Sequence, residues 1–233
     1  MSDNGAMQAL LAAFNDPEHA RRYSDGPQRF VPAITDLHRM TAILLAERAP
    51  KDARVLVLGA GGGLELRVFA TAQPSWTFVG VDPAGAMLSE ARRALGQDAA
   101  RVMFCEGYID DAPEGPFDAA TCLLTLHFLA TEERRRTLAE LRRRLKPGAP
   151  FVAAHSSFPQ SGDARLLWLS RYGAFARASG ADSAQVEKMI ATLDAHLPML
   201  APEQDEAILR DAGFSDITMF YAAFTWRGWI AYA

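Results

Sequence analysis

The chain has 233 residues, of which 49% are hydrophobic and 22% charged, and its formal net charge at pH 7 is −4. This is ordinary globular composition, and the length suits one domain with a small appended part. The mildly acidic balance lacks the basic excess of nucleic-acid-binding proteins, so we expect no nucleic-acid partner. We see no leader sequence and no apolar run near the roughly 18 residues of a membrane span, and therefore expect a cytoplasmic protein without membrane contact. The sequence leaves open a monomer or a homodimer.

The first fifty residues are expected to be helical. Residues 6–14 form a short apolar run that stops at Pro17. From Ile34 to Arg48, apolar side chains recur at the i, i+3, i+4 spacing of an amphipathic helix, which ends at Pro50. We interpret residues 1–50 as N-terminal helices that precede the core.

In the core, residues 51–157, short apolar runs alternate with helical patterns. The runs predict strands at 54–58, 76–81, 101–105, 117–124 and 150–155, separated by helices at 64–72, 85–95 and 131–145. Thr131 is expected to cap the last helix, and the basic runs 134–136 and 142–146 to form its solvated face. Strands that are apolar on both faces and alternate with helices predict an α/β fold, with a parallel sheet covered on both sides.

The last third of the chain departs from this alternation. Residues 164–197 have the pattern of two helices broken near Gly180, and we expect the segment 160–200 to be a helical cap over the site. A helix at 203–212 and two β-rich runs at 217–224 and 226–233 follow. The runs are joined tightly, which predicts a terminal hairpin. We interpret residues 1–233 as a single domain that ends in this C-terminal part, 201–233.

The most informative motif is a glycine-rich loop between the first predicted strand and a helix. Gly59, Gly61 and Gly63 let the backbone bend sharply and approach a ligand, and the next helix presents free N–H groups. Asp82 ends the following strand, where a carboxylate can accept both hydroxyls of a ribose. Together they predict a nucleoside-containing ligand at the carboxyl edge of the sheet. Leu64 stands where a dinucleotide fingerprint has glycine, which disfavours a nicotinamide oxidoreductase.

These features resemble the class I S-adenosylmethionine-dependent methyltransferases over about residues 50–156. The run 118–129 (DAATCLLTLHFL) resembles the fourth-strand motif of that family, and 145–149 (LKPGA) resembles its turn before strand five. The resemblance implies a Rossmann-like, seven-stranded, mostly parallel sheet of order 3-2-1-4-5-7-6, with strand 7 antiparallel and helices on both faces. It also implies a methyltransferase domain whose core, 51–157, binds S-adenosyl-L-methionine as cofactor.

The resemblance implies cofactor-binding residues in the glycine loop, at strand ends and in the N-terminal helices. They are Gly59, Ala60, Gly61, Gly63, Asp82, Pro83, Met87, Gly107, Tyr108, Leu124, Tyr23 and Arg39. Two positions depart from the family pattern. Val57 stands where the family usually has an acidic residue, and Tyr108 stands where it often has an aspartate that holds adenine. Tyr108 can instead stack on adenine or bond to it.

The candidate catalytic residues are two histidines at strand ends. A base is needed only where the acceptor of a methyl group must lose a proton, because the leaving group is already activated. His127 follows the fourth strand and His155 ends the fifth, so both belong to the carboxyl edge; contact with the cofactor or packing is the alternative for His127. His38 and His196 are expected to be structural or on the surface. The histidines lack metal-ligand spacing, and we expect no metal site.

The predicted function is methyl transfer from S-adenosylmethionine to a small-molecule acceptor. Aromatic residues in the later chain suit an apolar acceptor pocket and core packing equally; they are Trp168, Tyr172, Phe175, Trp226 and Trp229. A local likeness to carboxy-S-adenosylmethionine synthases, at 31–40, at 124–134 and in the AGF…F stretch that begins at residue 212, leaves that activity as one alternative. That family is implied to bind its extra carboxylate with an arginine of the cap, and 186–190 contains none. A non-catalytic cofactor-binding protein is the other alternative.

Overall fold

The computed structural model describes residues 3–23 and 26–233. Four helices precede the first strand: α1 (Asp3–Phe14), α2 (Pro17–Arg22), α3 (Gly26–Phe30) and α4 (Ile34–Ala46). Asp16 starts α2, because its carboxylate accepts the N–H groups of Glu18 and His19 at 2.7 and 2.9 Å. The sequence predicted α1 and α4, whereas α2 and α3 are too short for a helical period to be visible.

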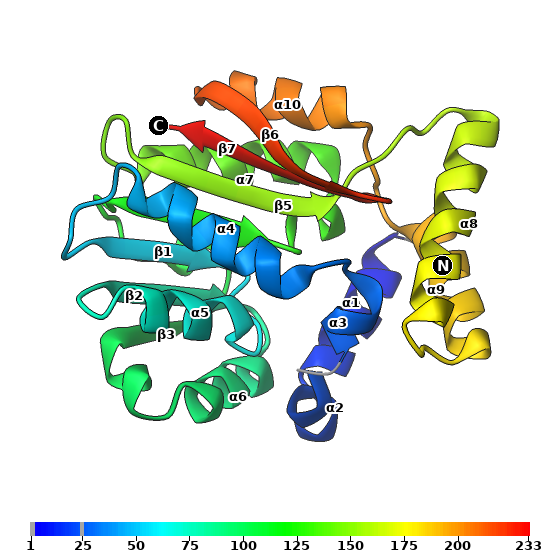
Figure 1. Cartoon of the computed structure of the whole chain (residues 1–233), viewed down its shortest axis with the longest axis horizontal. Helices are drawn as coiled ribbons and strands as arrows, with labels where there is room; N and C mark the ends of the chain where they lie inside the picture. The colour runs from blue at the N-terminus through cyan, green and yellow to red at the C-terminus, as the bar shows by residue number, and fades with distance from the viewer. Residues whose placement is uncertain (1–2, 24–25) are drawn as a thin grey trace.

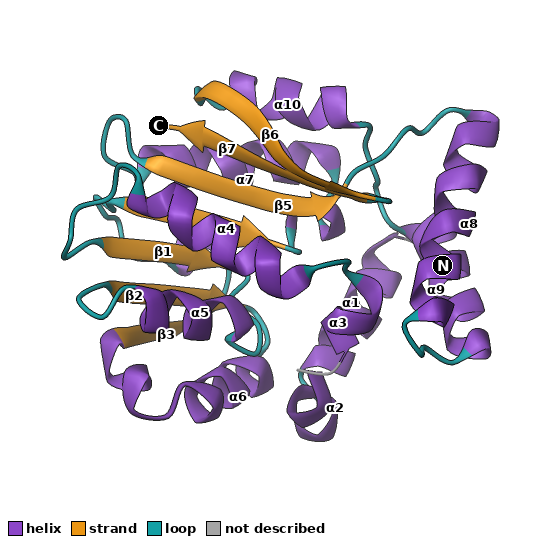
Figure 2. Cartoon of the chain, viewed as in Figure 1, coloured by secondary structure: helices purple, strands orange, loops and turns teal. Residues whose placement is uncertain are grey.

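A seven-stranded sheet of order β3-β2-β1-β4-β5-β7-β6 forms the centre of the molecule (Figure 2). Its strands are β1 (Arg54–Leu58), β2 (Thr77–Asp82), β3 (Val102–Glu106), β4 (Ala119–Leu123), β5 (Pro150–Ser156), β6 (Ser215–Ala223) and β7 (Trp226–Tyr232). The first five strands are parallel, and β7 is antiparallel to both β5 and β6. The predicted strand order, including the antiparallel seventh strand, is confirmed.

Helices cover both faces of the sheet. They are α5 (Leu64–Ala72), α6 (Gly85–Leu95), α7 (Thr131–Arg143) and α10 (Pro202–Asp211), with short 3₁₀ turns η2 (Gly96–Arg101), η3 (Ile109–Asp111) and η4 (Leu126–Phe128). In Figure 1, α4 and α5 lie on one face of the sheet and α7 and α10 on the other. Along β1, Val55 and Val57 pack into one core and Leu56 and Leu58 into the other. Burial on both faces explains the unbroken apolar run of this strand.

The helices α8 (Gly162–Ala178) and α9 (Ser183–His196) form the segment that was expected to be a cap. Gly180 separates them with a positive φ of 84°, and Asp182 caps α9 by accepting the Gln185 N–H at 3.0 Å. The pair stands at the carboxyl end of the sheet, beyond α1 and α3 as viewed in Figure 1, and it packs on Phe30. The side chain of His196 lies outside the described residues. In the described part of the chain, no helix combines the length and apolarity that crossing a bilayer requires.

Helix α7 differs from the sequence interpretation at its start and along its basic face. The N-cap is Ala130, and Thr131 is already helical, so the expected Thr131 cap is wrong. Arg134 and Arg144 are buried, at 0% and 2% exposure, so the basic runs do not form one solvated face. Arg134 lies four residues before Leu138 on the apolar stripe of the helix, which turns its side chain into the protein.

Buried Arg134 connects three segments that are distant in the sequence. Its guanidinium donates a hydrogen bond to the Asp205 carboxylate on α10. It also donates to the carbonyl oxygens of Leu129, at 3.4 Å, and Pro198, at 3.1 Å. Both members of the Arg134–Asp205 pair are excluded from water. A buried pair of this kind costs much to break, because the remaining charge has no solvent to stabilise it.

We expect Asp205→Asn to lower the free energy of unfolding by about 3–5 kcal/mol, the usual cost of leaving a buried charge without its partner. Asp211→Asn is the matched control, because Asp211 pairs with the neighbouring Arg135 at the surface. A surface pair contributes about 0–1 kcal/mol. Urea unfolding measures both values, and equal losses in the two variants would contradict the role given to burial.

Candidate functional site

A cavity opens at the carboxyl ends of the central strands, between the sheet and the N-terminal helices. Nine of the residues predicted to bind cofactor line it: Tyr23, Gly59, Gly61, Asp82, Pro83, Met87, Gly107, Tyr108 and Leu124. The remaining wall is largely apolar and includes Leu11 and Phe14 of α1, Ile34 of α4, and Phe128 and Leu129 after β4. The glycine loop and Asp82, which are separate motifs in the sequence, therefore line the same cavity.

The glycine loop after β1 depends on the absence of side chains. Gly59 and Gly63 both have a φ of +77°, in the left-handed region that disfavours other residues. A Cβ on Gly59 would lie 1.9 Å from Thr125 Oγ1, and one on Gly63 would lie 2.9 Å from Ala91 Cβ. The loop thus fits closely against the β4 end and against α6, and its backbone forms the floor of the cavity.

Asp82 at the end of β2 holds this loop in place. Its Oδ2 accepts the N–H of Gly61 at 2.8 Å, and its Oδ1 accepts the N–H of Ala84 at 2.9 Å. Burial raises the pKa of the carboxyl group, and the two backbone N–H groups act in the opposite direction. Each carboxylate oxygen has room for a second hydrogen bond, so Asp82 can accept two hydroxyl groups of a ligand while it keeps both backbone contacts.

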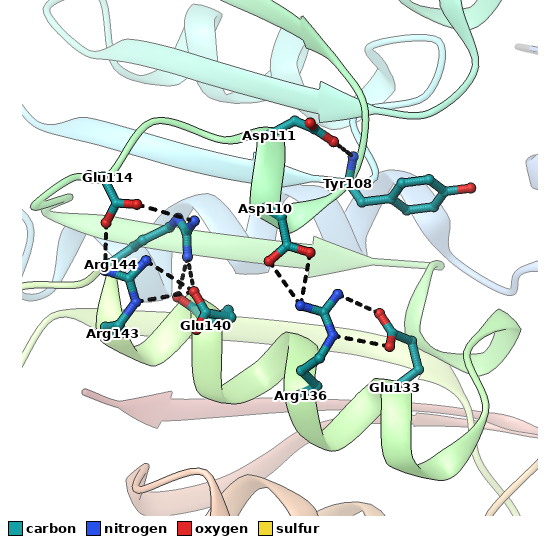
Figure 3. A network of polar contacts seen from close by, with 9 residues as sticks. All are labelled: Tyr108, Asp110, Asp111, Glu114, Glu133, Arg136, Glu140, Arg143 and Arg144. Atoms are coloured by element: carbon teal, nitrogen blue, oxygen red, sulfur yellow. Dashed lines mark hydrogen bonds and ion pairs between the residues drawn. The ribbon is translucent and has the colours of Figure 1, made fainter.

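Tyr108 and η3 form the side wall next to β3. The Tyr108 N–H donates to Asp111 Oδ2 at 2.8 Å, and the residue is 52% exposed. Figure 3 shows the Tyr108 ring directed away from a network of acids and arginines. In that network Arg136 on α7 bonds Asp110 at 2.8 Å and Glu133 at 2.7 Å, which ties η3 to the helix. Tyr108 therefore offers a flat apolar face on a braced turn.

The N-terminal helices cover the glycine loop. The Phe14 ring meets the rings of Tyr23 and Phe128 edge to face, with centroids 6.0 and 6.4 Å apart. Tyr23 lies over the loop, since a Cβ on Gly62 would come within 3.2 Å of its ring. Among the described residues that line the cavity, none belongs to α8 or α9. The covering layer in this structure is thus made by α1 and the Tyr23 segment.

Three of the predicted cofactor residues are not among those that line the cavity. Ala60 is fully buried, and its N–H bonds the Val81 carbonyl at 3.0 Å. Gly63 is the N-cap of α5 and packs on α6. Arg39 is an exposed residue of α4 whose guanidinium lies 3.3 Å from Asp36. Ala60 and Gly63 shape the loop, whereas Arg39 borders a separate surface groove.

The two candidate catalytic histidines lie behind the cavity wall. His155 Nε2 is 3.2 Å from Asp205 Oδ2, and its ring packs 5.2 Å from Trp229. His127 is buried next to Phe128, with ring centroids 4.1 Å apart. Burial, followed by the nearby charges of His155 and Arg134, holds the pKa of His127 well below its usual value. Neither ring is among the described residues that line the cavity, and a catalytic role for them stays a prediction.

Sequence reasoning missed three ionisable residues that line the cavity: Glu133, which is half-buried, and the buried His38 and Glu65. His38 is 5% exposed, and burial lowers its pKa to about 4, so the imidazole is neutral at pH 7. Glu65, in the first turn of α5, is 7% exposed, and burial raises its pKa to about 8. A signal existed for the two buried residues: His38 lies on the apolar stripe of α4, and Glu65 stands two residues after Gly63.

The aromatic residues of the later chain take part in packing. Tyr172 lies against Trp226, whose indole N–H donates to the Phe30 carbonyl at 3.0 Å. Trp229 is fully buried and donates to Glu206 at 3.0 Å. None of the five aromatic residues considered from the sequence is among the described lining residues of the cavity.

Known proteins share both the core sequence and the fold. Residues 55–148 match the family model of a methyltransferase domain. A carboxy-S-adenosyl-L-methionine synthase from Actinobacillus succinogenes is 28% identical over 227 residues, which cover 93% of this chain and 91% of that protein. A protein of the same name from Chromohalobacter salexigens is 24% identical over 214 residues, which cover 90% of this chain and 79% of that protein.

Two solved structures illustrate the likeness in fold. An O-methyltransferase family protein from Burkholderia thailandensis superposes with a TM-score of 0.66 at 20% identity. Human N-acetylserotonin methyltransferase, in complex with S-adenosylmethionine, gives 0.62 at 13% identity. They cover 94% and 96% of this chain, which spans only 61% and 58% of their own lengths.

The raised pKa of Glu65 makes stability depend on pH. Its folded-state pKa of about 8 exceeds the ordinary 4.5, so the folded form holds a proton that the unfolded form releases. This contribution is complete below pH 4.5 and is lost as the pH rises through 8. We expect the unliganded protein to lose up to about 1.4 kcal/mol of unfolding free energy per pH unit between those limits through this group alone.

The measurement is urea unfolding at several pH values, with Glu65→Gln compared to the unaltered chain. The variant should remove this part of the slope. Glu90→Gln should keep it, because Glu90 is 8% exposed but paired with Arg93 at 2.5 Å. A slope that survives Glu65→Gln would contradict the assignment.

Proposed function

Because the chain belongs to the class I S-adenosylmethionine-dependent methyltransferase family, we propose that it transfers the methyl group of S-adenosylmethionine to a small-molecule acceptor. One observation carries the proposal: the glycine loop, Asp82 and a set of apolar side chains surround a single covered cavity. Open α/β sheets bind ligands at this edge, and a covered cavity suits a small ligand better than a macromolecule.

The residues present fit the cofactor. The loop offers bare backbone at Gly61, where a Cβ would come 3.6 Å from Met87 Cε and use space that the ligand needs. In the proposal Asp82 accepts the ribose hydroxyls through its remaining lone pairs. The Tyr108 ring stacks on adenine, and the N–H groups of the first turn of α5 face the carboxylate of the methionine part.

S-adenosylmethionine supplies a methyl group on a sulfonium, so the leaving group needs no further activation. The task that remains for the chain is to align the acceptor with this methyl group and to keep water out. Phe14, Phe128 and Leu129 provide an apolar wall for both purposes. Where the acceptor must lose a proton, neutral His38 is the imidazole that lines the cavity and can accept a hydrogen bond from it.

Carboxy-S-adenosylmethionine synthesis is the second candidate, and its support is the similarity along the chain to synthases of that name. The charge of the cavity opposes it. An additional carboxylate on the cofactor calls for a cation, yet no arginine or lysine is found among the described lining residues, whereas Glu65, Asp82 and Glu133 are. We therefore propose the uncarboxylated cofactor as the methyl donor.

Asp82→Ala should weaken the binding of S-adenosylmethionine by about 1–3 kcal/mol, the size of lost hydrogen bonds to a charged group. Titration calorimetry measures the loss. Asp98→Ala is a suitable control, since Asp98 is a half-exposed partner of Arg101 outside the cavity. An unchanged affinity in Asp82→Ala would rule out its ribose contact.

Mass spectrometry of ligand released from the purified protein separates the two candidate activities. We expect S-adenosylmethionine or S-adenosylhomocysteine, because the acidic cavity disfavours a second carboxylate. The carboxylated cofactor has a different mass, and its recovery would favour the synthase reaction over methyl transfer.

A further inference from the structure

Glu65 is a buried acid whose position the fold alone does not explain. It lies in the first turn of α5, directly after the glycine loop, and it lines the cavity as a residue that is only 7% exposed. Three influences set the pKa of its carboxyl group. Burial raises the pKa most, a hydrogen bond from its own backbone N–H lowers it, and the negative charge of Asp82 raises it. Among the described residues no cation is paired with it, which distinguishes it from Glu90 and its partner Arg93.

An unpaired buried carboxylate is costly, and proteins keep such groups where a ligand provides the missing charge. Several ionisable groups face Glu65, and each is neutral or acidic. They are Tyr23 beyond α2, Asp82 on β2 and Cys122 on β4. No arginine or lysine is among the described residues that line the cavity, so a cationic ligand group at this end would meet only neutral or acidic side chains.

We propose that Glu65 binds the α-ammonium group of the methionine part of S-adenosylmethionine, and so supplies from α5 the acid that Val57 does not supply from β1. The inference rests on the proposed function. Val57 is fully buried in the core of β1 and has no charge to offer. Glu65 stands two residues after Gly63, the last glycine of the loop, and is among the residues that line the cavity.

The pKa of Glu65 gives this pairing a measurable proton signature. With a value of about 8 in the empty protein, the carboxyl group is mostly protonated at pH 7. An ammonium group beside it favours the ionised form, so ligand binding releases the proton to the buffer. The first turn of α5 then holds both charges of an amino acid, with its N–H groups toward the carboxylate and Glu65 toward the ammonium.

Three ligands separate the contacts that Glu65 could make. S-adenosylmethionine has both the ammonium and the sulfonium, S-adenosylhomocysteine has the ammonium only, and 5′-methylthioadenosine has neither. We expect Glu65→Gln to weaken the first two by about 10- to 100-fold, the range for a lost charge-assisted hydrogen bond, and to leave the third unchanged. Calorimetry at pH 7 in buffers of different ionisation enthalpy should show proton release with the unaltered protein and none with Glu65→Gln.

Glu90→Gln serves as the control and should bind all three ligands as the unaltered protein does. Three outcomes would overturn the assignment: unchanged affinity of Glu65→Gln for the two amino-acid ligands, a loss confined to S-adenosylmethionine, or an equal loss for 5′-methylthioadenosine. The second outcome would place the carboxylate at the sulfonium, and the third would make its role structural. Failure of the proposed function is a separate result, in which the unaltered protein binds none of the three.

Discussion

The hydrogen bond from the Gly61 N–H to Asp82 Oδ2 joins the two segments on which the site depends. Strands β1 and β2 are parallel neighbours with Leu58 opposite Val81, so the residues that follow them emerge side by side. The N–H groups of Gly59 and Ala60 both bond the Val81 carbonyl, which bends the loop across the end of β2. The carboxylate of Asp82 then fixes the rest of the turn. Without this contact the bare backbone at Gly61 would have no fixed place in the cavity.

Charge is distributed unequally between the cavity and the scaffold around it. The arginines near the site are engaged in structural contacts: Arg136 braces η3, and Arg134 joins α7 to α10. The acids Glu65 and Asp82 line the interior. This division fits a cationic methyl donor, because the arginines hold the walls together while no arginine or lysine is among the described residues that line the space between them. The same division is our reason for proposing the uncarboxylated cofactor as the methyl donor.

The central fold was largely predictable, because apolar periodicity and glycine spacing are local properties of a sequence. The bounds of β1, α5 and α6 agree with the expectations residue for residue. Burial of polar residues was not predictable in the same way. Arg134 stands in a run of three arginines and looks solvated until Asp205, 71 residues later, is placed against it. His38 and Glu65 were missed for the same reason, since only tertiary packing turns them toward the cavity.

The place of α8 and α9 has an evolutionary consequence. The pair leaves the sheet after β5 and returns before α10, and it rests on Phe30 rather than on the glycine loop. Its length and side chains can therefore diverge under selection while the donor-binding floor stays intact.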